Sequence, residues 1–189
     1  MKYYERNADK FIEETLTLDM SALYARFEKY LTSSSRILDL GCGSGRDLKY
    51  FSQKYDVIGL EPSPTLAKYA KGYSGQTVIN STIQSANNLA KFDAIWACAS
   101  LLHIPSIELS TTYKKLSRLL NKGGTIYCSF KYGKFEGEKN GRYFTDLTES
   151  KIEDYIFDHD LKIEEHWITD DLRPGRENEQ WLNLILVKE

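Results

Sequence analysis

Three glycines at alternate positions, Gly41, Gly43 and Gly45, form the part of the chain with the clearest chemical meaning. They follow the apolar segment 37–40, which is interrupted only by Asp39, and a helical pattern starts directly after them. A strand that ends in a glycine-rich turn before a helix lets backbone N–H groups approach a nucleoside-containing ligand closely. The segment therefore predicts a binding loop for a ligand of that kind.

Glu61 and the spacing of the glycines narrow the choice of ligand. Glu61 directly follows the largely apolar segment 56–60 and lies about twenty residues beyond the loop. At this position a carboxylate can accept hydrogen bonds from two ribose hydroxyls. A dinucleotide site reads G-x-G-x-x-G, whereas this loop reads G-x-G-x-G with an acid two residues before its first glycine. These features resemble the first motif of the class I S-adenosylmethionine-dependent methyltransferases. The resemblance extends from about residue 36 to the end of the chain.

The resemblance implies roles for individual residues. The glycines would let the chain approach the methionine part of S-adenosylmethionine, Asp39 would help to anchor its ammonium group, and Glu61 would hold the ribose. Without a ligand, the glycines would mark only a tight turn and Glu61 a solvated carboxylate. Arg46 either reaches the cofactor carboxylate or covers the edge of the sheet, and Asp47 is interpreted as a helix N-cap. The residues expected at the cofactor are Asp39, Gly41, Cys42, Gly43, Gly45, Arg46, Glu61, Pro62, Thr82, Ile83 and Cys98.

The segment 80–84 departs from the family pattern. Many relatives carry an acid there that accepts from the adenine amino group, whereas this chain has no carboxylate in the segment. Backbone groups near Ile83 can still recognise adenine, and Thr82 or Gln84 can add a side-chain hydrogen bond. Because a neutral hydrogen bond is weaker than a charge-assisted one, we expect a somewhat lower cofactor affinity.

Two side chains are candidates for catalysis, His103 and Tyr143. Methyl transfer from a sulfonium is an in-line displacement, so alignment of the acceptor supplies much of the acceleration and a base is needed only when the acceptor must lose a proton. His103 either acts as that base or orients the substrate, or it only caps the turn before Ile104. Cys98 is expected to be a buried structural cysteine, because Ala97 stands where nucleophilic cysteines of related enzymes have a proline.

Aromatic and basic residues gather after the predicted strand 125–130 and in the late polar stretch 169–179. Loops that follow strand C-termini bind ligands in doubly wound sheets, and arginine binds carboxylate or phosphate groups in bidentate fashion. The residues expected to bind substrate are Lys131, Tyr132, Arg142, Arg173 and Trp181. In the alternative interpretation Arg142, Arg173 and Arg176 form surface ion pairs with neighbouring acids, namely Glu136, Asp170, Asp171 or Glu177.

Strand and helix patterns alternate through most of the chain. Strands are expected at 36–40, 56–60, 77–80, 92–98, 125–130, 162–167 and 181–187, and helices at 47–54, after Pro64, at 106–120 and at 148–158. The glycine- and charge-rich segment 131–142 interrupts the pattern, and the last two strands are close enough to pair antiparallel. The prediction is an α/β, doubly wound, Rossmann-like sheet of seven strands, mostly parallel with one antiparallel strand near the edge and helices on both faces.

Length and composition favour one domain. We expect residues 1–189 to form a single S-adenosylmethionine-dependent methyltransferase domain, with a helical lid at 1–34 that includes Tyr4 and Phe11, and a catalytic core at 35–189. The net charge of −2 gives no general footprint for nucleic acid, and the three separated cysteines favour neither a disulfide framework nor a metal site. No apolar stretch approaches the length of a bilayer span, so the expected location is the cytoplasm. The oligomeric state stays open.

The predicted function is methyl transfer from S-adenosyl-L-methionine to a small molecule, for which an anionic acceptor is one option, leaving S-adenosyl-L-homocysteine. The run 43–47 in a short chain is similar to the bacterial tellurite-resistance and ubiquinone-biosynthesis types of methyltransferase. The alternatives are methylation of nucleic acid or protein, and a non-catalytic S-adenosylmethionine-binding module. A nicotinamide dehydrogenase is disfavoured by the glycine spacing. The sequence leaves the acceptor atom open.

Overall fold

A seven-stranded mixed sheet organises the residues described in the computed structural model, 2–176 and 178–189. The order is β3-β2-β1-β4-β5-β9-β8, and β9 runs antiparallel to both of its neighbours. The predicted sheet with one reversed strand beside its edge is therefore confirmed. The strands are β1 (Arg36–Leu40), β2 (Asp56–Leu60), β3 (Val78–Ile79), β4 (Phe92–Ala97), β5 (Leu120–Lys131), β8 (Leu161–Asp170) and β9 (Gln180–Lys188).

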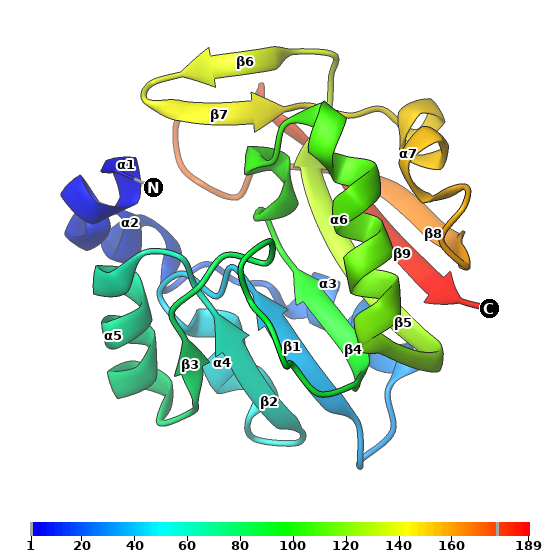
Figure 1. Ribbon diagram of the computed structural model, residues 1–189. Helices are drawn as coiled ribbons and strands as arrows, with labels where there is room; N and C mark the ends of the chain where they lie inside the picture. Colours follow the sequence, from blue (N-terminus) through cyan, green and yellow to red (C-terminus); the bar gives the residue numbers. More distant parts are fainter. Residues whose placement is uncertain (1, 177) are drawn as a thin grey trace.

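Helices cover both faces of this sheet (Figure 1). One face carries α3 (Ser21–Phe27), α4 (Arg46–Phe51) and α5 (Pro64–Ser74), and the other carries α6 (Ser106–Leu119) and α7 (Glu149–Ile156). The period of two along the strands explains the two cores. Ile37 and Trp96 pack toward α3 and α4, whereas Leu38 and Ile95 pack toward α6. The central strands are thus buried on both faces, as parallel strands must be.

The start of β5 differs from the prediction. The sequence predicts a helix at 106–120 and a strand at 125–130, but α6 ends at Leu119 and β5 already begins at Leu120. A Cβ on Gly124 would lie 2.9 Å from the carbonyl oxygen of Asp93, so glycine allows β5 to run close against β4. The pairing of the two strands shifts register between Phe92 and Ala94.

Part of the segment expected to interrupt the pattern is a β-hairpin. Strands β6 (Glu136–Lys139) and β7 (Arg142–Thr145) form a separate two-stranded sheet at the top of the view in Figure 1. The turn residues Asn140 and Gly141 both have positive φ, 53° and 73°, as a tight hairpin turn requires. An Asn-Gly pair between two short segments is a readable hairpin signal, which the glycine and charge content of the segment obscured.

The N-terminal segment divides into two parts with different positions. Helices α1 (Lys2–Arg6) and α2 (Ala8–Thr15) lie beyond the C-terminal ends of the parallel strands, whereas Tyr24 and Phe27 of α3 are buried in the core. A short 3-10 helix, η1 (Glu28–Tyr30), leads from α3 to the first strand. No helix formed by residues 2–176 and 178–189 is long and apolar enough to cross a bilayer.

Candidate active site

A cavity of about 1050 Å³ opens at the C-terminal ends of the parallel strands. Its floor is the loop after β1, the end of β2 and the 3-10 helix η2 (Leu101–His103) that follows β4. Tyr4 and Phe11 of α1 and α2 line one side, and Arg142 and Phe144 of the hairpin line another. This is the place where doubly wound sheets bind ligands, and the volume is at the upper end of the roughly 300–1,000 Å³ typical of ligand pockets.

The glycines of the loop have conformations that other residues adopt poorly. Gly41 has φ +76°, and a Cβ there would lie 2.5 Å from the Cβ of Ser100. Gly45 has φ +81° and stands as the N-cap of α4, where a Cβ would lie 2.9 Å from the backbone of Ala70. The glycines therefore allow the loop to pack against β4 and α5 while its backbone stays exposed to the cavity.

Glu61 connects the glycine loop to the start of α5. Its two carboxylate oxygens accept from the backbone N–H of Gly43, at 2.9 Å, and from that of Ser63, at 2.8 Å. Burial raises the pKa of Glu61 although these two hydrogen bonds favour its charged form. Each carboxylate oxygen has a further lone pair, so the side chain can still accept from two ligand hydroxyls.

Asp39 lies beneath the loop and is 2% exposed. Its Oδ2 atom is buried and accepts no hydrogen bond. Burial raises the pKa of Asp39 well above its ordinary value, and the nearby negative charge of Asp47 raises it further. A buried carboxylate in this state is strongly stabilised by a cation, because the cation supplies the missing charge and a hydrogen-bond donor. The side chain does not itself form part of the cavity wall.

The expected N-cap role of Asp47 is wrong, because Gly45 caps α4 and the Asp47 side chain points into the core. Asp47 accepts from the indole N–H of Trp96 at 2.8 Å and from the hydroxyl of Tyr24. Burial opposes its ionisation, yet Arg46 and these hydrogen bonds hold the pKa of Asp47 below its ordinary value.

Arg46 spans from this buried network to the N-terminal segment. Its Nε donates to Asp47 at 2.6 Å, and its Nη1 donates to the backbone carbonyl of Thr15 in α2 at 3.0 Å. The side chain also lines the cavity. Its charge is thus compensated by Asp47, and its position ties the end of α2 to the glycine loop.

The other cofactor candidates lie around the same wall. Ile83 is buried. Asn80 donates to the backbone carbonyl of Glu61 at 2.8 Å, and this hydrogen bond joins the end of β3 to the residue expected to hold the ribose. Of the predicted cofactor residues, the cavity is lined by Gly41, Cys42, Gly43, Arg46, Glu61, Pro62, Thr82, Ile83 and Cys98, whereas Asp39 and Gly45 support it from below.

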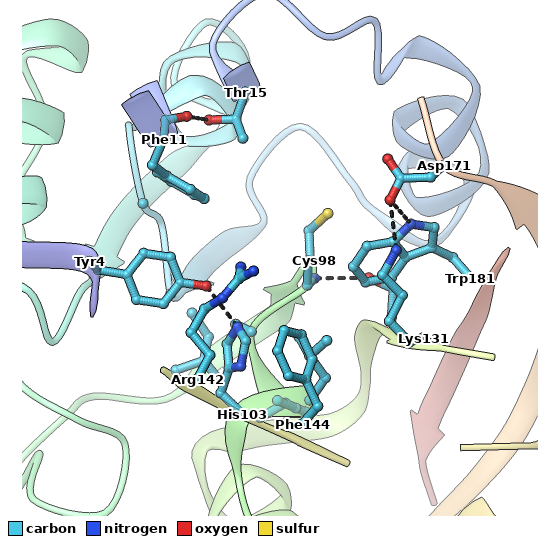
Figure 2. A pocket seen from close by; sticks show the side chains of 18 of the residues that line it. Tyr4, Phe11, Thr15, Cys98, His103, Lys131, Arg142, Phe144, Asp171 and Trp181 are labelled. Carbon is cyan, nitrogen blue, oxygen red and sulfur yellow. Dashed lines mark hydrogen bonds and ion pairs between the residues drawn. The ribbon is translucent and has the colours of Figure 1, made fainter. Parts of the chain in front are cut away.

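His103 has a defined tautomer. Its Nδ1 lies 2.7 Å from the backbone carbonyl oxygen of Tyr143, and because a carbonyl can only accept, Nδ1 carries the proton. Burial lowers the pKa of His103 to about 4, so the ring is neutral at pH 7 and its Nε2 is an unprotonated acceptor. The hydroxyl of Tyr4 donates to this Nε2 at 2.7 Å (Figure 2).

Tyr143 does not join His103 through its side chain. The Tyr143 hydroxyl is exposed and donates to Glu136 at 2.9 Å, and the residue is not part of the cavity wall. Only its backbone carbonyl contacts His103, as described above. The hairpin strand β7 thus contributes to the site through its backbone at Tyr143 and through the side chains of Arg142 and Phe144.

Three of the predicted substrate residues meet at one carboxylate, Asp171. Lys131 donates to it at 2.7 Å, Arg173 at 2.6 Å and the indole N–H of Trp181 at 3.0 Å. Although burial opposes it, Arg173 and Lys131 hold the pKa of Asp171 well below its ordinary value. Sequence patterns did not single out Asp171 as a hub, because its three partners come from β5, β9 and the loop between β8 and β9.

Two of the three arginines form ion pairs, although not as the alternative interpretation described them, because the Arg173 pair is largely buried and the partner of Arg176 is another acid. Arg173 pairs with Asp171, which that interpretation named, and Arg176 pairs with Glu179 at 3.7 Å. Glu177, another suggested partner, lies outside the described residues. In the described part of the chain Arg142 forms no ion pair, and its buried Nε has no hydrogen-bond partner.

Comparison with known proteins agrees with this geometry. Residues 37–124 match the model of a methyltransferase domain. A 2-heptyl-1-hydroxyquinolin-4(1H)-one methyltransferase of Mycobacteroides abscessus is 23% identical over 149 residues, covering 74% of this chain and 62% of that relative. The chain spans only about 60% of the length of the curated relatives it matches, 62% and 58% for two of them.

Solved structures give the same fold. A 1,6-didemethyltoxoflavin-N1-methyltransferase of Burkholderia thailandensis, with S-adenosylhomocysteine bound, has a TM-score of 0.77 and 18% identity over 99% of this chain and 84% of its own. A TehB-like methyltransferase of Corynebacterium glutamicum has a TM-score of 0.75 and 18% identity over 100% of both chains. The fold, the glycine loop and these matches make the chain similar to the class I S-adenosylmethionine-dependent methyltransferases. Within that class its shape is similar to the small TehB-like proteins.

The residues present fit S-adenosylmethionine. The buried Oδ2 of Asp39 has no hydrogen-bond donor, and the carboxyl group lies beneath the loop that lines the cavity, where it favours the positively charged ammonium group of the methionine part. Glu61 lines the cavity at the end of the neighbouring strand with acceptor capacity for ribose hydroxyls. The backbone of the glycine loop lies between these two carboxylates, where a Cβ at Gly43 would lie 2.9 Å from the ring of Phe11.

Proposed function

We propose that this chain transfers a methyl group from S-adenosyl-L-methionine to a small-molecule acceptor held beside His103. The observation that carries the proposal is the neutral Nε2 of His103, an acceptor fixed in the cavity just beyond β4. The relatives support a small acceptor, since their names specify a hydroxyquinolinone and a didemethyltoxoflavin. The cavity lies within the molecule beside the glycine loop and has room for a second ligand.

The chain's own residues bind and orient the reactants. Asp39, Glu61 and the loop backbone hold the donor, whose sulfonium supplies an electrophilic methyl group and retains the bonding electrons as a neutral thioether. His103 accepts the proton that a hydroxyl or amine acceptor loses, while the Tyr143 carbonyl keeps its Nδ1 protonated. Because a sulfonium methyl is already activated, the main contribution of the cavity wall to catalysis is to align the acceptor.

Helices α1 and α2 act as the lid in this proposal, as part of a single domain. Glu5 of α1 accepts from the hydroxyl and the N–H of Thr65, at 2.8 and 3.2 Å, and also from the hydroxyl of Ser63. These polar contacts, together with the few contacts of Tyr4, Phe11 and Thr15, hold the lid, so it can open for ligand exchange. We place the reaction in the cytoplasm, where Cys42, Cys98 and Cys128 stay free thiols.

Titration calorimetry with S-adenosylhomocysteine tests the donor site. We expect one site per chain and no binding of NAD, and we expect Glu61→Gln to weaken binding about tenfold or more, because a charged acceptor is lost. Glu136→Gln is the control, since this carboxylate lies outside the cavity wall. Binding of NAD with none of S-adenosylhomocysteine would contradict the proposal.

The acceptor is found by incubating the protein with labelled donor and metabolite extracts. Once a product is identified, we expect His103→Gln to lower kcat by about 10²- to 10⁴-fold, the usual contribution of a general base. A labelled product in nucleic acid or protein instead of small molecules would contradict the proposed acceptor class.

A further inference from the structure

We infer that the acceptor is an amphipathic molecule with an acidic hydroxyl on an aromatic or enolic ring, bound at His103 and Arg142, and an apolar body that crosses a rim formed by Tyr132, Phe135 and Leu172. The inference rests on the proposed function and specifies its substrate class. Two independent sets of contacts carry it, one for the hydroxyl group and one for the apolar body.

The chain's own Tyr4 shows what the polar end of the cavity accepts. Its phenol oxygen lies 2.7 Å from His103 Nε2, and burial raises the pKa of Tyr4 although the nearby guanidinium of Arg142 opposes this shift. The ring of Tyr4 contacts that of Phe11 edge to face, with centroids 5.2 Å apart. A phenol therefore fits between the imidazole and the lid, and the acceptor hydroxyl takes the place of Tyr4 when the lid rearranges (Figure 2).

Arg142 differs from the other buried cations on the cavity wall. Arg46, Lys131 and Arg173 each contact a carboxylate within 3 Å. Arg142 instead lies over the rings of Tyr3 and Phe144, with centroids at 4.5 and 5.0 Å, and its buried Nε has no hydrogen-bond partner. An uncompensated cation with an open N–H donor beside His103 favours a ligand oxygen that bears negative charge.

The chemistry of His103 selects an acidic hydroxyl. A neutral imidazole whose pKa is lowered to about 4 is a weak base, so it cannot hold the proton of an ordinary alcohol. A ring hydroxyl loses its proton more readily, and Arg142 stabilises the resulting oxyanion. The proton moves to Nε2, the ring keeps its Nδ1 hydrogen bond to Tyr143, and the electron pair stays on the acceptor oxygen, ready for the methyl group.

The rim provides the second set of contacts. Tyr132, Phe135 and Leu172 are 39%, 45% and 56% exposed, and all three border the cavity. They come from the connection after β5, the start of the hairpin and the loop between β8 and β9, so three separate segments place large apolar side chains at one opening. Apolar surface gathered at the mouth of a ligand cavity gains free energy when an apolar ligand covers it.

A series of para-alkylphenols tests the apolar body. With the protein saturated with S-adenosylhomocysteine, calorimetry should show an affinity that rises about fourfold for each methylene that reaches the rim. Phe135→Ser and Leu172→Ser should flatten this dependence. Ile107→Ser is the control, because Ile107 is 89% exposed on α6 and is not part of the cavity wall. Affinity independent of chain length would overturn the inference.

Para-nitrophenol tests the polar end, because its absorbance reports the phenolate form. Because Arg142 favours the charged form against the effect of burial, we expect Arg142→Gln to raise the pH at which the bound phenol ionises. We expect His103→Phe to lower its affinity tenfold or more and Tyr4→Ala, which removes the competing hydroxyl, to raise it severalfold. Equal affinity for alkylbenzenes without a hydroxyl would overturn the inference. Failure of S-adenosylhomocysteine itself to bind would overturn the proposed function as well, so the two failures are distinguishable.

Discussion

At the scale of single residues, Asp39 combines a structural cost with a binding role. It is buried, one of its oxygens has no partner, and its pKa is raised. We expect Asp39→Asn to stabilise the protein without cofactor by about 1–3 kcal/mol at pH 7, because burial opposes the charged form of Asp39 and an amide has no charged form. Urea unfolding measures this gain. Calorimetry should show that the same substitution weakens S-adenosylhomocysteine binding, and a variant that loses both stability and affinity would contradict this account.

The pH dependence of cofactor affinity has a defined sign. The pKa values of Asp39 and Glu61 are both raised by burial, and the donor interacts with their ionised forms. As the pH falls through these raised values, the carboxyl groups take up protons that binding must release again, so affinity falls. Calorimetry at several pH values in two buffers of different ionisation enthalpy should show this loss together with proton release. In Asp39→Asn the dependence should be weaker.

The loop residues could be predicted from the sequence because glycine spacing and nearby acids are local signals. The role of Asp47 could not, because its partners Tyr24 and Trp96 are 23 and 49 residues away in sequence. The pairing of Lys131 with Asp171 could not be predicted either, because the two residues are 40 positions apart in the sequence. Residue types at one position say what a side chain can do, whereas long-range contacts decide which partner it has.

At the scale of elements, the contact between helices α4 and α5 can be tested with two glycines, one at the contact and one away from it. Gly45 caps α4 with positive φ and lies against Ala70 of α5, whereas Gly72 lies in α5 with nothing within 4 Å of a Cβ. We expect Gly45→Ala to destabilise the protein by more than about 1 kcal/mol and Gly72→Ala to stabilise it by up to about 1 kcal/mol. Thermal unfolding distinguishes the two. Equal effects would contradict the role of the α4–α5 contact.

Elements with strong periodicity were predicted well. Strands β1 and β2 have the predicted bounds, since each is a short apolar run between turn signals. Strand β8 extends to Asp170, beyond its predicted end, and part of the expected loop is therefore strand. The hairpin β6–β7 was missed because β6 is polar throughout and the hairpin pairs outside the main sheet, where no two-sided core imposes an apolar alternation.

At the scale of the whole molecule, the ligand cavity is bounded by segments from both ends of the chain and from its middle. Saturation with S-adenosylhomocysteine at about a hundredfold of its Kd should raise the free energy of unfolding by about 2.7 kcal/mol. Hydrogen exchange should show added protection in residues 3–18 and 132–147, which form the sides of the cavity, and little change in β1 and β4, which are already buried. Protection confined to the core strands would contradict a closing lid.

The hairpin forms its own two-stranded sheet, and this affects how acceptor selectivity can change among related proteins. The hairpin hydrogen-bonds within itself and contributes Arg142 and Phe144 to the cavity, while the donor loop rests on β1, β2 and β4. An insertion or exchange between residues 133 and 146 can therefore alter selectivity without disturbing the strands that hold the methyl donor. The hairpin is a natural unit for grafting between relatives, and a chimera should keep its affinity for S-adenosylhomocysteine while acquiring the acceptor preference of the hairpin's source.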